Sequence, residues 1–233
     1  AGVMPAWDAP LQRLGEALAE RVGVGIGVCV QALQGQPEPL FPAEASAVAR
    51  AVPRRQHEFA WGRTAAREAM RQLGWPVQAV PSGQDRAPVW PAGLVGSISH
   101  CSTGCVALVA PRAQVLALGI DMEDAKALDT ELWPLLLTVR ERAALQALPV
   151  HERGMQAMRV FSAKEAFYKW QYPATTTVLE FQDAEIFWEA GADDFSVACD
   201  SLKGTPLHRA SGRWLSDGQW VVSWVISRSG LGG

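Results

Sequence analysis

The sequence has few cysteines, no long apolar run and no excess of basic residues, and each shortage excludes a class of protein. Four cysteines in 233 residues are too few for a scaffold built on disulfide bonds. The longest stretch without a charged residue, residues 87–111, contains prolines, serines and glycines and is not a membrane-spanning helix. No signal-peptide pattern opens the sequence, and the net charge is −3. We therefore expect a cytoplasmic protein that binds neither membranes nor nucleic acids.

What is present is typical of a globular protein. Hydrophobic residues make up 48% of the chain and charged residues 19%, with 10 tryptophans. Apolar periodicity predicts helices near residue 10 and over residues 58–73, 138–148 and 155–170. It predicts strands over residues 22–30, 105–110, 115–120, 184–188, 195–199 and 220–226. Helices and strands occur in both halves, which favours a mixed α/β or α+β fold.

The charges are divided unevenly along the chain. Residues 1–118 contain ten arginines, no lysine and eight acidic residues, a net charge of +2, whereas residues 119–233 have a net charge of −5. The densest basic stretch carries Arg50, Arg54, Arg55, Arg63, Arg67 and Arg71. Because the planar guanidinium group suits phosphate, this stretch is a candidate anion site. The clustering of these arginines, taken by itself, is explained at least as well by a solvated helix face with ion pairs.

Two carboxylates stand at the end of a predicted strand, in Gly119-Ile120-Asp121-Met122-Glu123. Side chains two residues apart on an extended strand lie on the same side. Two carboxylates with room for water and phosphate oxygens suit Mg²⁺. An ordinary acidic turn is the alternative, because an Asp-x-Glu pair is common.

A second charged pair follows about forty residues later on a predicted helix. Glu165 and Lys169 are one turn apart on a common face. They form either an exposed ion pair or part of the same pocket as Asp121 and Glu123. In that pocket, Glu165 would complete the metal site or act as a base, and Lys169 would neutralise a phosphate.

A third segment is Val95-Gly96-Ser97-Ile98-Ser99-His100-Cys101. Small and hydroxyl residues beside a glycine leave backbone N–H groups accessible to an anion, and His100 would contact phosphate or transfer a proton. A buried histidine bonded to the backbone is the alternative. Ser99 and His100 would point to opposite faces of a strand and make a poor nucleophilic couple. Cys101 and Cys105 lack a second pair for zinc and are expected to be core thiols.

Together, in this order and spacing, these segments resemble the 4′-phosphopantetheinyl transferases of the Sfp type (EntD-like). That family carries Ser-x-Ser-His, then Gly-Ile-Asp-x-Glu, then Phe/Trp-x-x-Lys-Glu-Ala-x-x-Lys, which match residues 97–100, 119–123 and 161–169. Residues 59–67 resemble the family's arginine-bearing helix, and residues 86–91 its proline-rich approach to the histidine. The resemblance covers residues 54–170, about half of the chain.

The resemblance implies an α+β fold of two similar α/β-type halves in a pseudo-two-fold arrangement, with coenzyme A between them. Residues 1–113 would be the arginine-rich, coenzyme A-binding half and residues 114–233 the metal-binding, catalytic half. The implied enzyme is a monomer that moves 4′-phosphopantetheine from coenzyme A to a serine of an apo acyl or peptidyl carrier protein. The reaction is Mg²⁺-dependent and releases adenosine 3′,5′-bisphosphate. Fatty-acid, polyketide, nonribosomal-peptide and siderophore carriers all stay open.

The resemblance also implies a role for each matching residue. Asp121, Glu123 and Glu165 would hold Mg²⁺ against the pyrophosphate. Glu165, or a water bound to it, would take the proton from the carrier serine, and Lys169 would stabilise charge on the pyrophosphate. The phosphates of coenzyme A would contact Arg55, Arg63, Arg86, Ser99, His100 and Lys169, and His100 would join Glu165 and Lys169 in catalysis.

Some assignments stay open. Arg54 competes with its neighbour Arg55, and Lys164 has no assigned role, a surface position being one interpretation. Residues 125–137 either pack in the core or form part of a carrier-docking groove with Trp133 and Leu136 as contacts. Two other functions use the same residues: an Mg²⁺-dependent phosphohydrolase, and a non-catalytic module that binds carrier proteins or nucleotides. The intact charged positions of the second half favour the transferase.

Overall fold

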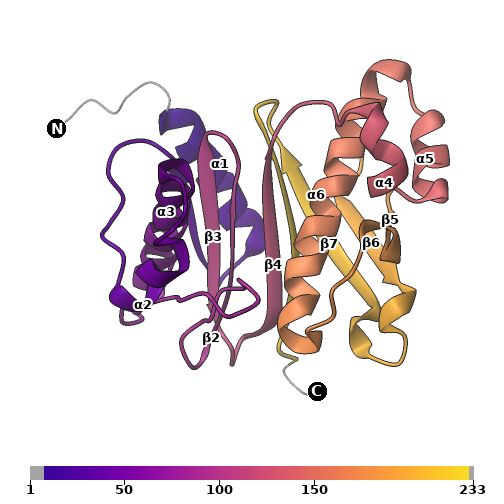
Figure 1. Cartoon of the computed structure of the whole chain (residues 1–233). Coiled ribbons are helices and arrows are strands. Elements are labelled where there is room, and N and C mark those ends of the chain that lie inside the picture. Colours follow the sequence, from indigo (N-terminus) through magenta and orange to yellow (C-terminus); the bar gives the residue numbers. More distant parts are fainter. Residues whose placement is uncertain (1–7, 231–233) are drawn as a thin grey trace. The chain divides into compact units, whose positions relative to one another are not determined.

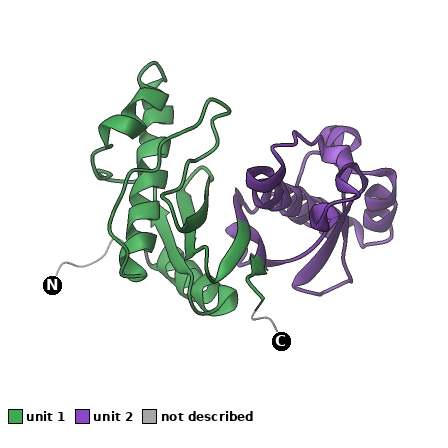
Figure 2. Cartoon of the chain, turned by 90° about the horizontal axis from the view of Figure 1, so that it is seen from below, with its two compact units in different colours: residues 1–118, 227–233 green, residues 119–226 purple. Residues whose placement is uncertain are grey.

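The computed structural model describes residues 8–230, which form two compact units (Figure 2). Of the described residues, unit 1 comprises 8–118 and 227–230, and unit 2 comprises 119–226. Each unit combines an antiparallel sheet with a long helix packed on it (Figure 1). The mixed α+β class predicted from the sequence is confirmed.

Unit 1 is built on a three-stranded sheet in the order β1-β3-β2, in which both pairs are antiparallel. Its strands are β1 (Gly27–Ala32), β2 (Leu94–His100) and β3 (Gly104–Pro111), and its helices are α1 (Asp8–Val22), α2 (Pro42–Ala45) and α3 (Pro53–Gln72). Helix α3 begins at a proline, whose missing N–H costs nothing in a first turn, and is followed by Gly74 with φ 70°.

The alanine-rich face of α3 lets the helix lie unusually close to the sheet. Ala65, Ala66 and Ala69 are fully buried against the strands. At Gly27 the backbones meet, because a Cβ there would lie 2.1 Å from the Ala69 carbonyl oxygen. Only glycine fits this position of β1 without moving the helix.

Unit 2 is built on a five-stranded sheet in the order β4-β8-β7-β6-β5. The strands are β4 (Val115–Asp124), β5 (Ala184–Phe187), β6 (Asp194–Cys199), β7 (Arg209–Ser216) and β8 (Trp220–Arg228). The helices are α4 (Trp133–Leu136), α5 (Val139–Gln146) and the long α6 (Val150–Thr175), which lies across the sheet (Figure 1). Strands β4 and β8 each continue past the boundary between the units.

Several predicted elements differ from the observed ones. The strand predicted over residues 22–30 starts only at Gly27, because α1 continues to Val22 and a turn with positive φ at Gly23 and Gly25 follows. Strands β2 and β7 were not predicted, since glycine, serine and arginine weaken the strand pattern.

All four cysteines are buried and, within residues 8–230, none forms a disulfide bond; the expectation that Cys101 and Cys105 are core thiols is confirmed. Burial raises the pKa of the Cys29 thiol to about 12, with a smaller contribution from Glu68. Within residues 8–230, no helix has the length and apolar character needed to cross a lipid bilayer.

Two arginines of the basic stretch, Arg63 and Arg67, are buried, so α3 does not present a solvated charged face at these positions. Arg67 forms an ion pair with Glu44, which is completely buried in α2. Glu44 also accepts hydrogen bonds from the backbone N–H groups of Phe41 and Val80, both at 2.9 Å. The Glu44 carboxylate thus joins α2, α3 and the loop before β2 into one scaffold.

We predict that the substitution Glu44→Ala lowers the free energy of unfolding by about 3–5 kcal/mol, because it removes the buried carboxylate that pairs with Arg67 and leaves Arg67 only the partly exposed Glu38, at 3.3 Å. The surface pair Glu68–Arg71 provides the matched control, and Glu68→Ala is expected to change stability by less than about 1 kcal/mol. Urea unfolding of both variants measures the difference. Equal effects of the two substitutions would contradict the structural role of Glu44.

Candidate active site

The carboxylates of unit 2 are brought together by a close backbone contact between β4 and α6. A Cβ on Gly119 would lie 2.1 Å from the Ala166 carbonyl oxygen and 2.6 Å from the Trp170 backbone nitrogen. The strand therefore passes directly against the helical turn that carries Glu165 and Lys169. Because Asp121 follows two residues after this contact, its side chain reaches the same turn.

The contact assembles a charged cluster of four predicted site residues. The ammonium group of Lys169 donates to the backbone carbonyl of Ile120 at 2.9 Å and pairs with Asp121 Oδ1 at 3.3 Å. Glu123 is hydrogen-bonded to the Asp121 side chain, and Glu165 lies within electrostatic range of Asp121 and Lys169. The exposed Glu165–Lys169 ion pair, the alternative from the sequence, does not form; Lys169 pairs with Asp121 instead.

Burial and mutual repulsion disfavour the charged forms of these carboxylates. Burial, together with the Asp121 charge and the hydrogen bond to Asp121, raises the pKa of Glu123 to about 9, against an opposing effect of Lys169. Burial and Asp121 also raise the pKa of Glu165. The cluster thus holds more carboxylates than Lys169 can neutralise.

These residues fit a magnesium ion that is shared with a substrate. Within the described part of the chain, no three His, Cys, Asp or Glu side chains form a compact group able to hold a metal ion alone. Mg²⁺ does not need such a cage, because it binds through one or two carboxylates, water and substrate phosphates. Asp121 and Glu123 supply two adjacent carboxylates, and Glu165 adds negative charge nearby.

In unit 1, three predicted arginines line one hollow of about 430 Å³. Arg55 and Arg63 reach it from α3, together with Phe59, and Arg86 reaches it from the loop before β2. Arg54 does not line this hollow; it is exposed and pairs with Glu58 at 3.0 Å.

Arg63 is a buried cation without a carboxylate partner. It is 5% exposed and lies 4.0 Å above the Phe59 ring. Its guanidinium donates to the Val80 carbonyl at 2.8 Å and to Ser82 Oγ at 3.2 Å, and among residues 8–230 no carboxylate lies within ion-pair distance. Burial lowers its pKa to about 10, with smaller contributions from Arg55 and Arg67 against Glu44. A buried positive charge of this kind favours an anionic ligand.

Arg86 is held at the hollow by a tight loop. Its φ is 67°, a left-handed conformation that costs a residue other than glycine on the order of 1–3 kcal/mol. Hydrogen bonds from Gly83 N to the Ala87 carbonyl at 2.9 Å and from Arg86 N to the Gly83 carbonyl at 3.0 Å close this loop.

His100 lies beside the arginines, whereas Ser99 does not. His100 Nε2 is 3.4 Å from Arg55 Nη1 and 3.9 Å from Glu58 Oε2, on the α3 side of the sheet. Ser99 is buried and points to the other face, because successive residues of a strand alternate. The segment is the strand β2, paired with β3, and not a loop.

Lys164 is a structural residue and not a surface one. It is 3% exposed, and its ammonium group bonds to Glu141 at 2.9 Å and to the carbonyls of Leu136 and Phe181 at 2.9 and 2.7 Å. Burial lowers its pKa, against an opposing effect of Glu141. These bonds hold the turn before Glu165 against α4 and α5, a role that no local sequence signal indicated.

Of the two interpretations of residues 125–137, packing in the core holds for Trp133 and Leu136. Trp133 and Leu136 are buried, and the Trp133 indole donates to the Leu128 carbonyl at 3.2 Å. The exposed apolar side chains of this segment are Leu132 and Leu135, the latter 65% exposed. One turn of a helix buries some of its residues and exposes others, and the composition of the segment does not reveal which are buried.

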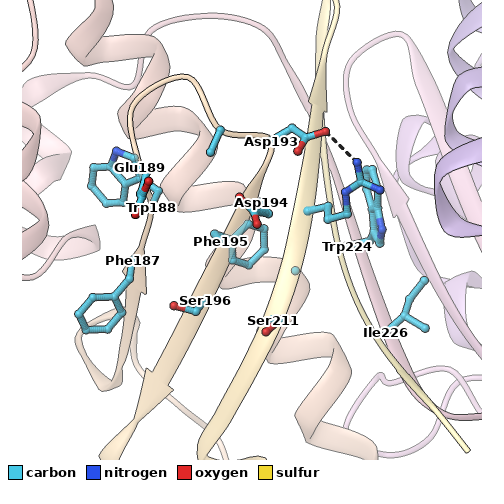
Figure 3. Close-up of a pocket in the computed structure, with 13 residues that line it drawn as sticks. Phe187, Trp188, Glu189, Asp193, Asp194, Phe195, Ser196, Ser211, Trp224 and Ile226 are labelled. Atoms are coloured by element: carbon cyan, nitrogen blue, oxygen red, sulfur yellow. Dashed lines mark hydrogen bonds and ion pairs between the residues drawn. The ribbon is translucent and has the colours of Figure 1, made fainter.

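Two further hollows lie in unit 2. One of about 180 Å³ adjoins Glu165 and is lined mainly by Phe167, Tyr168, Leu179 and Phe181. The larger one, of about 1020 Å³, lies over β5 to β8 and is shown in Figure 3, with Asp193 paired to Arg213 above Trp224. None of the predicted site residues lines the larger hollow.

Comparison with known proteins agrees with the geometry. The profile of the 4'-phosphopantetheinyl transferase N-terminal domain matches residues 43–110, and that of the 4'-phosphopantetheinyl transferase superfamily matches residues 117–224. The chain is 38% identical to 4'-phosphopantetheinyl transferase Svp of Streptomyces mobaraensis, over 79% of this chain and 77% of that protein. It is 32% identical to 4'-phosphopantetheinyl transferase PptT of Mycobacterium tuberculosis (80% and 85% covered) and 31% identical to enterobactin synthase component D of Escherichia coli K12 (74% and 73% covered).

The N-terminal-domain profile spans the arginine-lined hollow, and the superfamily profile spans the carboxylate cluster. The family typically uses Mg²⁺ and coenzyme A, which agrees with the carboxylates and the anion-binding arginines. The chain therefore belongs to the 4′-phosphopantetheinyl transferases of the Sfp/EntD type, enzymes that transfer 4′-phosphopantetheine from coenzyme A to carrier proteins.

Proposed function

We propose that the carboxylate cluster of unit 2 carries out the transfer and that the arginine-lined hollow of unit 1 binds phosphate groups of coenzyme A. The observation that carries this proposal is the assembly of Asp121, Glu123, Glu165 and Lys169 around one strand end. Three arginines and His100 supply positive charge for the nucleotide phosphates.

Each residue of the cluster has a distinct task in the transfer. Asp121 and Glu123 would hold Mg²⁺ with the pyrophosphate oxygens, and the bound ion supplies charge neutralisation at the phosphorus under attack. Glu165 accepts the proton of the carrier serine as its oxygen bonds to the phosphorus; a raised pKa makes it a stronger base than an ordinary glutamate. The bond to adenosine 3′,5′-bisphosphate breaks in the same step, and Lys169 stabilises the negative charge of that leaving group.

The small hollow beside Glu165 fits the pantetheine arm. The arm is attached to the phosphorus that reacts, so it must leave the cluster from a position next to the base. A narrow hollow with walls of Phe167, Tyr168 and Phe181 adjoins Glu165 directly. Its mainly apolar lining suits a thin chain of methylene and amide groups.

The exposed leucines of the segment before α5 are suited to contact a carrier protein. Leu132 and Leu135 lie on and beside α4, which Lys164 ties to the turn of Glu165 through the Leu136 carbonyl. An apolar side chain exposed close to the base would meet the surface around the carrier serine. Carrier specificity among acyl and peptidyl carriers would be set here.

We predict different effects for the adjacent arginines Arg54 and Arg55. Arg55→Ala removes a cation from the hollow and is expected to raise the KM for coenzyme A about tenfold, the effect of one charged hydrogen bond. Arg54→Ala, the matched control, is expected to change it less than about twofold, because Arg54 does not line the hollow. Steady-state kinetics with varied coenzyme A measure both, and a larger effect of Arg54→Ala would refute the assignment.

We predict that Glu165→Gln lowers kcat by about 10²- to 10⁴-fold with little change in the KM for coenzyme A, because it removes the proton acceptor. Glu152→Gln, at an exposed position of the same helix, is the control and should keep wild-type activity. Intact mass of an apo carrier protein after incubation with coenzyme A and Mg²⁺ follows the product. Omitting Mg²⁺ should abolish the mass increase. Cleavage of coenzyme A while the carrier stays apo would instead favour a phosphohydrolase.

We predict that Leu135→Asp raises the KM for the carrier protein about tenfold and leaves the KM for coenzyme A unchanged, because it places a charge in the proposed interface. Val150→Asp introduces the same charge at another exposed apolar residue of unit 2 and serves as the control. The experiment varies the carrier concentration at saturating coenzyme A. An unchanged carrier KM for Leu135→Asp would exclude this surface.

A further inference from the structure

A chain of buried hydroxyl groups leads from β8 through α6 to Asp121. Ser162 Oγ donates to Asp121 Oδ2 at 2.9 Å, and Ser223 Oγ donates to Ser162 Oγ at 2.8 Å. Both serines are completely buried, and Asp121 is 3% exposed. Neither serine has a role in the transfer as derived above.

Apolar packing alone does not explain why a serine stands at position 223. It stands in Trp220-Val221-Val222-Ser223-Trp224-Val225, a strand whose other buried residues are apolar. Burying a hydroxyl group in such surroundings costs free energy unless the group is hydrogen-bonded. Within residues 8–230, its hydrogen bond is the one to Ser162.

The bond from Ser223 determines where the Ser162 proton points. A serine in a helix commonly donates back to the carbonyl four residues earlier, and a hydroxyl group has a single proton to give. Because Ser223 donates to the Ser162 oxygen, the Ser162 proton is left for Asp121 Oδ2, and the two hydrogen bonds polarise each other.

We propose that Ser162 and Ser223 are positioning residues that hold the Asp121 carboxylate in the orientation required to bind Mg²⁺; this rests on the proposed role of Asp121 as a metal ligand. Lys169 holds Oδ1 at 3.3 Å and Ser162 holds Oδ2 at 2.9 Å, so the carboxylate is restrained from both sides. Partners behind a ligand orient it toward the metal, and their loss weakens metal binding although they never touch the ion.

The test measures Mg²⁺ binding directly. Isothermal titration calorimetry of Mg²⁺ into the whole protein saturated with coenzyme A gives the Kd for the ion. Ser162→Ala is expected to raise this Kd about 10- to 100-fold, the effect of losing an outer-shell partner. Carrier modification followed in parallel should lose kcat while the KM for the carrier stays unchanged.

Substitutions at Ser223 test whether this residue acts on Asp121 through Ser162. Ser223→Ala is expected to raise the Kd for Mg²⁺ roughly two- to tenfold, because it removes one neutral hydrogen bond behind Ser162. Ser223→Thr keeps the hydroxyl and should restore affinity. The double variant should equal Ser162→Ala alone, since Ser223 acts on Asp121 only through Ser162.

Two controls separate this proposal from a structural role and from the proposed function. Thr205→Ala removes a hydroxyl with two hydrogen bonds in the same unit, away from the cluster, and should lower Tm without changing the Kd for Mg²⁺. If Ser162→Ala likewise lowers Tm alone, the positioning role is refuted. If Asp121→Asn itself leaves Mg²⁺ affinity unchanged, the proposed metal site fails and the serine proposal with it.

Discussion

The close contact between the backbones of β4 and α6 is the constraint on which the carboxylate cluster of unit 2 depends. It exists because position 119 carries no side chain, and a Cβ there would overlap the Ala166 carbonyl. Two residues after this contact comes Asp121, and the neighbours of Ala166 on the helix include Glu165 and Lys169. Any larger residue at position 119 would push the strand from the helix and separate Asp121 from Glu165 and Lys169.

Buried charges occur in this protein in two kinds. Glu44 with Arg67, and Glu141 with Lys164, are paired inside the protein and stabilise the placement of helices. Arg63 is buried without a carboxylate, and the cluster around Asp121 has more carboxylates than cations. Desolvation makes such incomplete charges costly, and in the function we propose this cost is offset by ligands of the opposite sign: phosphate groups for the arginine and a cation for the carboxylates.

The paired charges also show why neighbouring residues of one motif have unrelated tasks. Lys164 and Glu165 are adjacent and both border the small hollow, yet the Lys164 ammonium group is bound by two carbonyl oxygens and a carboxylate, whereas Glu165 lies near Asp121 and Lys169. On a helix, consecutive residues are rotated by 100°, so the Lys164 ammonium group reaches α4 and α5 while Glu165 faces the carboxylate cluster. In the function we propose, Lys164 therefore contributes to stability and Glu165 to chemistry.

Local spacing was enough to predict most helices and the grouping of Asp121 and Glu123 with Glu165 and Lys169. The i, i+2 spacing of Asp121 and Glu123 on a strand and the helical register of α6 depend only on backbone periodicity. Strands β2 and β7 were missed because pairing with β3 and β6 outweighs the weak strand preference of their serines and glycines.

The sequence by itself determined the fold class, the charge separation and the family resemblance, because composition and short-range periodicity are properties of the chain. Only the tertiary structure decided that Arg55 and not Arg54 lines the hollow, that Trp133 is buried, and that Ser223 supports Asp121. These outcomes depend on contacts between residues far apart in the chain, and no local pattern encodes which distant backbone will approach a given side chain.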